Sequence, residues 1–418
     1  MRSVVLVVVD TLRADHLSAY GYARPTSPAL AARAAEGALF EHAFAPSSWT
    51  LPSFASLYTG LFPHQHGAGR ARDGGYTALD PSVAALAEQL AGQGFATAAI
   101  ANNPFLHPSF GLARGFATYE YVYGNLRRQP RASRVVWAGL RWLDQRDPER
   151  RFLLVLHCFD PHLPYDAPPP ARGAFAAESA GTLARPFSGV GGAANAGWAP
   201  RDPEERRFVI GAYDEELLFV DQQLPHLFAG LAERKLLGET LVVLTADHGE
   251  ELFDHGGFEH GHTLHQELLH VPLVLWGPGV RAQRIETPVS LVDVTPTLLD
   301  ALGLPPLAGA AGVSLWPLVT RGEPLTARAL SAGGTLYGAE RTAIVRWPWK
   351  LVAVEGGAPA LYDLASDPNE ERDLAGASPE RVSALAAELP DRAPRAGAPA
   401  PVLDAKTREQ LSELGYGR

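Results

Sequence analysis

The stretch Val4–Asp10, which reads VVLVVVD, indicates the fold class. Six consecutive apolar residues, five of them valine, are typical of a strand that is buried on both faces of a parallel sheet. Similar runs of strand length follow along the chain, at Phe95–Ala101, Phe152–His157, Leu241–Thr245 and Val271–Trp276. Helical patterns lie between them. Strands that alternate with helices predict an α/β fold with a doubly wound, mostly parallel sheet and helices on both faces.

Capping residues mark where several helices begin and end. Pro28, directly after Ser27, predicts the first turn of a helix that Gly37 closes. A second helix is predicted at Ser82–Gln93, and a longer helical pattern covers Glu204–Arg234.

The pattern changes after about Gly322, where short strand-like segments replace the long runs. These segments are Thr342–Arg346, Lys350–Val354 and Ala360–Tyr362, and a helix is predicted from Pro379 to Leu389. We therefore expect a catalytic α/β domain at residues 1–322. A small C-terminal α+β subdomain, with an antiparallel sheet and a helix, is expected to pack on it at residues 323–418.

Composition argues against several classes of partner. The formal net charge of −10 is unlike that of a nucleic-acid binder, which needs clustered Lys and Arg. Cys158 is the only cysteine, and no stretch approaches 18 uncharged apolar residues. The expectation is a cytoplasmic protein that binds neither nucleic acid nor membrane. The sequence leaves the oligomeric state open, a homo-oligomer included.

Acidic and imidazole side chains follow two of the predicted strands. Asp10 comes after the first strand, and Asp247 and His248 follow Leu241–Thr245. Ligand sites in open α/β sheets collect at the carboxyl ends of strands, and this set of side chains suits a divalent cation. Either carboxylate alone could equally cap the turn that follows it.

Thr50 precedes Leu51 and Pro52, which fits the first turn of a helix. A hydroxyl at a helix start is ordinarily an N-cap. The alternative is a nucleophile, because unpaired amides and the helix dipole would hold an anionic ester beside the hydroxyl. Histidines are also dense here: six of the fourteen lie between His248 and His270, while His162 follows another strand.

Seven segments in order resemble the sulfatase family of the alkaline phosphatase superfamily. They are 10–17 (DTLRADHL), 50–67 (TLPSFASLYTG to PHQHG), 160–165 (DPHLPY), 245–250 (TADHGE), 271–279 (VPLVLWGPG), 293–297 (DVTPT) and 361–368 (LYDLASDP). The resemblance implies metal ligation by Asp10, Asp247 and His248, with Thr50 as the nucleophile that also touches the metal. It implies further that His162 contacts substrate, and that His260 or His262 contacts the leaving group or the anion.

Three departures from the family pattern affect the expected chemistry. Sulfatases convert a Cys or Ser to formylglycine, and oxidation of Thr50 would give a ketone instead. Phe54 stands where the family motif has Arg, and Asn102 holds the place of an active-site Lys. Water must then cleave a threonyl intermediate directly, as in phosphoryl-transfer members of the superfamily. Asn102 and His162 are expected to stabilise the ester oxygens, and His260 or His262 to protonate the leaving group.

The predicted function is therefore a metal-dependent hydrolase of small anionic phosphate-type esters (phosphomonoesters, phosphodiesters or phosphonates) that acts through a covalent Thr50 intermediate. One cation is expected, Mn²⁺ or Zn²⁺ in preference to Ca²⁺ or Mg²⁺, because a histidine is among the ligands. The alternatives are a sulfatase without formylglycine, a phosphotransferase and a catalytically inactive binding protein.

Overall fold

The central sheet is built around β1 (Ser3–Val9), whose residues are all buried. The computed structural model describes residues 1–418 except 73, 124–130, 190–198, 391–397, 400 and 417–418. Strand β1 pairs in parallel with β10 (Thr240–Ala246) on one side and with β7 (Phe152–Cys158) on the other. Both neighbours are also buried throughout, which explains why these strands read as unbroken apolar runs.

The sheet continues outward from these three strands in the order β14-β2-β13-β10-β1-β7-β5-β6, and β15 also pairs with β2. The other strands are β2 (Ala38–Phe44), β5 (Ala96–Ala101), β6 (Thr118–Tyr121), β13 (His270–Trp276), β14 (Gln283–Ile285) and β15 (Val289–Ser290). Strand β13 is antiparallel to β10 and β2, and the other pairs are parallel. The predicted mostly parallel α/β sheet is confirmed.

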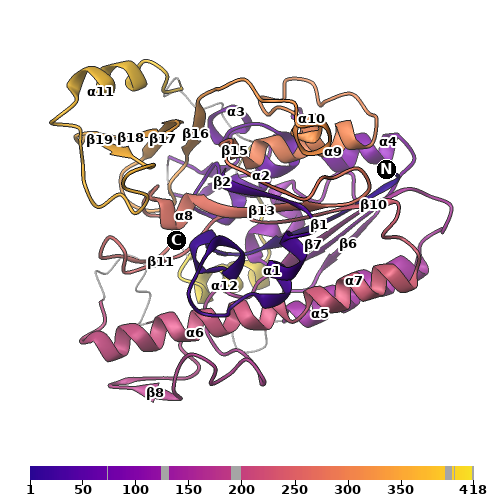
Figure 1. Cartoon of the computed structure of the whole chain (residues 1–418), viewed down its shortest axis with the longest axis horizontal. Coiled ribbons are helices and arrows are strands. Elements are labelled where there is room, and N and C mark those ends of the chain that lie inside the picture. The colour runs from indigo at the N-terminus through magenta and orange to yellow at the C-terminus, as the bar shows by residue number, and fades with distance from the viewer. Residues whose placement is uncertain (73, 124–130, 190–198, 391–397, 400, 417–418) are drawn as a thin grey trace.

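Helices cover both faces of the sheet. Four helices pack together on one face: α1 (Pro28–Ala34), α5 (Ala132–Gln145), α6 (Pro203–Asp221) and α7 (Leu224–Glu233) (Figure 1). On the other face lie α2 (Thr50–Thr59), α4 (Leu86–Gly92), α9 (Val294–Ala301) and α10 (Trp316–Arg321). Within the described parts of the chain, no helix combines the length and apolar character that a bilayer crossing requires.

Two helices differ from the sequence-based expectation. The pattern at Glu204–Arg234 forms two helices, α6 and α7, because Pro225 has no amide proton and cannot continue the hydrogen bonding of α6. Helix α4 begins at Leu86 rather than Ser82, since the Glu88 side chain accepts a hydrogen bond from the Ala85 amide and fixes the helix start there.

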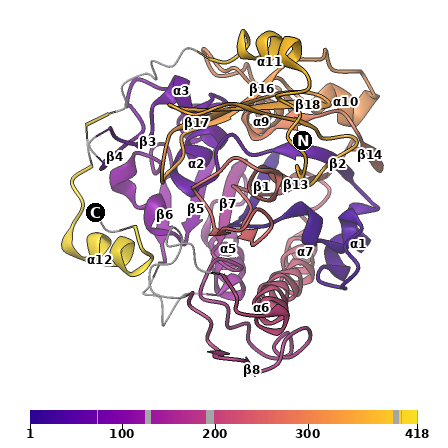
Figure 2. The same cartoon turned by 90° about the vertical axis from the view of Figure 1, so that its left-hand side faces the viewer.

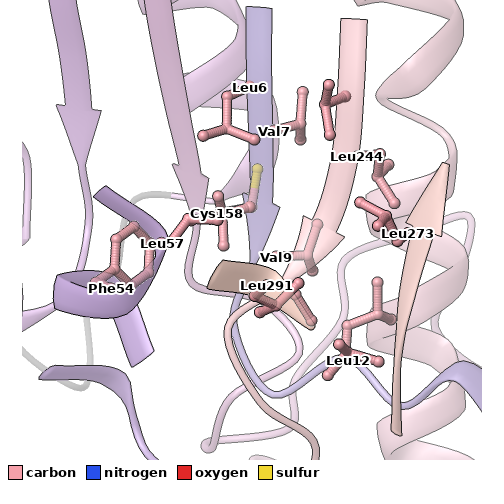
Figure 3. Packing of buried hydrophobic residues seen from close by; sticks show 14 of the residues in the cluster. Leu6, Val7, Val9, Leu12, Phe54, Leu57, Cys158, Leu244, Leu273 and Leu291 are labelled. Carbon is pink, nitrogen blue, oxygen red and sulfur yellow. The ribbon is translucent and has the colours of Figure 1, made fainter. Parts of the chain in front are cut away.

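The core fixes α2 against the carboxyl ends of the central strands. Phe54 and Leu57 of α2 belong to the same buried cluster as Val9 of β1 and Cys158 at the end of β7 (Figure 3). Full burial of an aliphatic or aromatic side chain stabilises by about 1.5–3 kcal/mol. Helix α2 is therefore packed beside the ends of β1 and β7.

A second sheet follows the last helix of the main body. Its strands run β16 (Leu330–Gly333), β17 (Arg341–Arg346), β18 (Trp349–Val354) and β19 (Ala360–Asp363), all antiparallel, and α11 (Pro379–Ala386) packs on it. This confirms the small C-terminal antiparallel sheet with its helix, while the domain boundary at residue 322 stays a prediction. Helix α12 (Ala405–Glu413) lies apart from this sheet, beside β6 (Figure 2).

The remaining strands and α-helices of the described residues are short. They are α3 (Pro63–His66), α8 (Gln266–Leu269), and the two-stranded pairs β3 (Gly69–Arg70) with β4 (Tyr76–Thr77), β8 (Ser179–Ala180) with β9 (Leu183–Ala184), and β11 (Glu251–Leu252) with β12 (Phe258–Glu259).

Candidate active site and metal centre

Strand pairing brings Asp10 and Asp247 to one place. Val9 of β1 is in register with Ala246 of β10, and the next residue on each strand is an aspartate. The ligating atoms of Asp10, Asp247 and His248 all lie within 4.8 Å of one another. These three form the one group of metal-ligating side chains found among the described residues. The cluster predicted from the sequence is therefore assembled by the sheet.

The backbone turns sharply after Asp10. Thr11 has a φ of 52°, in the left-handed region that a β-branched residue rarely adopts. Its carbonyl accepts a hydrogen bond of 2.8 Å from the hydroxyl of Tyr213, which holds this turn in place. The turn fixes the direction in which the Asp10 carboxylate leaves the end of β1.

The electrostatics of the cluster suit a cation. Asp10 Oδ1 and Asp247 Oδ2 are buried and have no hydrogen-bond partner. Burial and the neighbouring Asp247 carboxylate raise the pKa of Asp10 well above its usual range, and burial also raises the pKa of Asp247. Buried carboxylate oxygens without partners are costly unless a positive charge satisfies them.

His248 presents a lone pair to the two carboxylates. Its Nδ1 lies 2.9 Å from the Gly249 carbonyl, so that nitrogen carries the proton of the neutral ring. Nε2 is then the acceptor atom, 3.6 Å from Asp10 Oδ1 and 3.4 Å from Asp247 Oδ2. Two carboxylate oxygens and an imidazole nitrogen, all turned toward one point, fit a divalent cation.

Thr50, the first residue of α2, lies beside His248 in this group of side chains. Its Oγ1 is 3.4 Å from His248 Nε2, and the side chain is 2% exposed. The N-cap position of α2 is occupied by Trp49, so Thr50 does not act as the N-cap residue. Ser53 connects this turn to the Asp10, Asp247 and His248 group, because its hydroxyl donates a 2.5 Å hydrogen bond to the Asp247 carbonyl.

Asn103 is a site residue that the sequence reasoning missed. Its Nδ2 donates to Asp10 Oδ2 at 2.6 Å and to Thr50 Oγ1 at 3.3 Å. Our expectation named the adjacent Asn102, and its role stays a prediction. Neighbouring residues in extended backbone point to opposite sides, so a one-residue error in alignment changes which side chain faces the site.

The two candidate histidines of the 260 region lie in different places. His260 is 2% exposed, and its ring centre lies 4.5 Å from that of His248. His262 is turned away and pairs with Glu251, with 2.6 Å between His262 Nε2 and Glu251 Oε2. His260 is therefore the one that faces the site.

His260 and His162 lie together, and both rings are buried. Their ring centres are 5.1 Å apart. Burial lowers the pKa of His162 to about 3 and lowers that of His260 well below its usual value. The expectations that His162 contacts the ester and that a histidine of the 260 region protonates the leaving group stay predictions.

Tyr416 and His157 are two further residues that no motif indicated. The Tyr416 hydroxyl lies 3.1 Å from His162 Nε2 and 2.7 Å from His260 Nε2. His157, on β7, places Nε2 at 3.5 Å from Asp10 Oδ2. The apolar run that contains His157 gave a weak signal for a polar residue facing this cluster, whereas Tyr416 lies in a segment with no recognisable motif.

Comparison with known proteins finds a family model that covers most of the chain. The family model for Sulfatase matches residues 2–304. The chain belongs to the sulfatase family. This family is part of the alkaline phosphatase superfamily, and the match contains Asp10, Thr50, Asp247 and His248.

Relatives of this sulfatase-family chain include arylsulfatase K of Xenopus laevis, which is 33% identical over 205 residues, or 46% of this chain and 38% of the relative. The chain thus spans little more than a third of the length of that curated relative. Two solved structures share the fold. The phosphonate monoester hydrolase of Agrobacterium radiobacter has a TM-score of 0.75 at 23% identity and covers 93% of this chain and 94% of its own. A protein in complex with D-glucosamine-2-N,6-O-disulfate has a TM-score of 0.78 at 17% identity, over 99% and 98% of the two chains.

Proposed function

We propose that this protein is a metal-dependent hydrolase of phosphate-type esters that uses Thr50 as a covalent nucleophile. The observation that carries the proposal is the position of the Thr50 hydroxyl, 3.4 Å from His248 Nε2 and beside a cluster of unsatisfied carboxylate oxygens. A threonine hydroxyl is a weak nucleophile by itself and needs an activating group in contact with it.

Asp10, Asp247, His248 and Thr50 are proposed to hold one divalent cation. With a cation held there, the pKa of the Thr50 hydroxyl would be lower and a bound ester oxygen would carry less negative charge. We propose Mn²⁺ or Zn²⁺ rather than Ca²⁺ or Mg²⁺, because imidazole nitrogen is a ligand that these metals accept readily.

The other side chains position the ester. Asn103 donates to Thr50 Oγ1 and so orients the attacking oxygen. His162 and His260, whose ring centres lie 5.1 Å apart, are proposed to contact the remaining ester oxygens. A well-placed donor of this kind contributes about 3 kcal/mol in the transition state. Attack by Thr50 forms an oxygen–phosphorus bond and breaks the bond from phosphorus to the alcohol, which takes up the proton that the Thr50 hydroxyl gives up. Water then attacks the phosphorus of the threonyl ester, restores the Thr50 hydroxyl and releases the phosphate.

Sulfate-ester hydrolysis is the second candidate, and the similarity to arylsulfatase K favours it. Thr50 favours phosphoryl transfer because a secondary alcohol cannot be oxidised to the aldehyde on which the sulfatase route depends. Matched aryl phosphate, phosphodiester, phosphonate and sulfate substrates would decide between them. We expect kcat/KM to be highest for one of the three phosphorus esters, and a higher value for the sulfate ester would contradict the proposal.

The nucleophile is tested by Thr50→Ala, with Thr59→Ala as the matched control on the same helix. Thr59 is equally buried, but its hydroxyl donates to the Ala55 carbonyl and does not face the proposed metal ligands. We expect Thr50→Ala to abolish turnover while it still binds metal, and Thr59→Ala to retain turnover. Acid-quenched wild-type protein should carry a phosphoryl group on the peptide that contains Thr50. Normal turnover by Thr50→Ala would contradict the assignment.

A further inference from the structure

Glu250 is a fully buried carboxyl group beside the candidate active site. It comes two residues after His248, so one short backbone segment carries Asp247, His248 and Glu250. The proposed reaction does not use this side chain. A buried carboxyl group is costly unless its oxygens have hydrogen-bond partners, so the partners of Glu250 indicate what it does.

Both carboxyl oxygens of Glu250 have a partner. Oε1 lies 2.7 Å from His260 Nδ1, and Oε2 accepts a 3.3 Å hydrogen bond from the Tyr165 hydroxyl. The Glu250 carbonyl accepts a 3.1 Å hydrogen bond from Arg13 Nη1. Tyr165 and Arg13 are themselves buried. Glu250 is therefore held at its backbone and at one carboxyl oxygen, and it presents the other oxygen to the His260 ring in a fixed position.

His260 lies outside the regular elements, directly after β12. Its neighbours Glu259 and Gly261 both have positive φ values, of 69° and 84°. Because the backbone is irregular here, the direction of the His260 ring depends on what its nitrogens contact. With Nδ1 bound to Glu250, Nε2 faces away from Glu250 and lies 2.7 Å from the Tyr416 hydroxyl.

Other histidines of this region pair with carboxyl groups nearer the surface. Partly exposed histidine side chains form the pairs His262–Glu251, His255–Glu267 and His265–Glu370. In the Glu250–His260 pair both side chains are buried, and the His260 ring lies against that of His248, a proposed metal ligand. The Glu250–His260 pair is therefore the one of these four whose histidine is turned toward the candidate site.

We propose that Glu250 is a positioning residue, which holds the His260 ring so that Nε2 contacts the oxygen of the departing alcohol. A carboxylate accepts a hydrogen bond from Nδ1 and a carboxylic acid donates one to it, and either bond keeps the ring in this orientation. The inference rests on the proposed function in one respect, namely that His260 contacts the ester. A ring that is fixed before the substrate binds is already in the geometry that the reaction needs.

Replacement of Glu250 by leucine and by glutamine tests this role. Glu250→Leu keeps a similar volume but releases the His260 ring, and we expect kcat/KM to fall by about 100-fold. The side-chain amide of Glu250→Gln can donate to Nδ1 or accept from it, so this variant should stay within about tenfold of the wild type. Glu251→Leu makes the same change in the pair that is turned away. It is the matched control, and it should keep wild-type kcat/KM per folded molecule, with the folded fraction taken from thermal unfolding.

Two further measurements separate positioning from a loss of stability. Because Glu250 acts through His260, the double variant Glu250→Leu/His260→Gln should be no less active than His260→Gln alone. The loss in Glu250→Leu should also be larger for a phenyl ester than for a 4-nitrophenyl ester of the same acid, since the more acidic alcohol needs less assistance in leaving. If Glu250→Leu does not fold, Tyr165→Phe takes its place: it removes only the hydroxyl that holds Oε2, and it should give a smaller loss with the same dependence on the ester.

Additive losses in the double variant, equal losses with the two esters, or an equal loss in Glu251→Leu would each overturn the proposal. The comparisons use the ester that the wild type cleaves fastest, so a preference for sulfate esters would count against the proposed function alone. If the wild type cleaves none of them, the proposed function fails, and binding of inorganic phosphate to the manganese-loaded protein decides the inference. Isothermal titration calorimetry should then show weaker binding by Glu250→Leu than by Glu251→Leu, and equal or absent binding would overturn the role of Glu250.

Discussion

Replacement of Asp10 by asparagine should stabilise the metal-free protein and remove its response to metal. Asp10 and Asp247 are fully buried, and their ligating oxygens lie within 4.8 Å. At an effective dielectric constant of about 20, two unit charges at that distance repel by about 3.5 kcal/mol. Asn103 can still donate to the oxygen of the new amide, so the substitution removes charge without removing a hydrogen-bond acceptor.

The expected magnitude follows from this repulsion. Partial protonation of the pair reduces the gain in unfolding free energy to about 1–3 kcal/mol. With an unfolding entropy of about 2.1 cal/mol/K per residue, this corresponds to about 1–3 °C in Tm for a chain of 418 residues. Saturating metal should stabilise the wild type by about 2.7 kcal/mol at a hundred times its Kd, and the variant by much less.

Thermal unfolding in EDTA and in excess Mn²⁺ is the assay. The order of stability should reverse: Asp10→Asn unfolds at the higher temperature in EDTA, and the wild type does so in Mn²⁺. Asp147→Asn, the same chemical change at an exposed position, should show no reversal. The reasoning is refuted if Asp10→Asn is the less stable protein in EDTA, or if metal shifts both proteins equally.

Two further predictions concern histidines. His260→Gln should lower kcat/KM by about 100-fold or more, since His260 faces the site. His262→Gln should keep wild-type activity because His262 pairs with Glu251, and equal losses in steady-state assays would contradict the geometry. A hydrogen bond to Glu267 raises the pKa of His255 from 6.5 to about 9, so its contribution to stability is complete below pH 6.5 and is lost as pH rises through 9. The Tm difference between wild type and His255→Gln should therefore shrink between pH 6 and 9.5, and a constant difference would exclude this ion pair as its source.

Parts of the site could be predicted because strand ends obey a simple rule. Asp10 and Asp247 each follow a buried parallel strand, and the carboxyl ends of adjacent parallel strands lie side by side. The position of Thr50 at the start of α2 was predicted from Pro52, while its role as nucleophile came from a family motif and stays a prediction. Such inferences succeed where local sequence and sheet topology together determine the position of a side chain.

Other features depend on contacts that local sequence does not encode. His260 and His262 are two residues apart in the sequence. The ion pair between His262 and Glu251 turns His262 away, so that His260 is the one that faces the proposed metal ligands. The sequence pointed to Asn102 but not to its neighbour Asn103, which contacts Thr50, because the direction of a side chain at a strand end alternates with each residue. Tyr416 reaches the site through the packing of α12 against the main body, which no periodicity or motif near the end of the sequence predicts.

A crystal structure of the zinc-loaded protein, with anomalous scattering measured at the zinc edge, examines the central idea most directly. We expect one ion at about 2.0–2.2 Å from oxygens of Asp10 and Asp247 and from His248 Nε2, with Thr50 Oγ1 next to the ion. An ion bound elsewhere in the molecule, or a Thr50 oxygen that lies beyond coordination distance of the ion, would contradict the assignment of Thr50 as a metal-activated nucleophile.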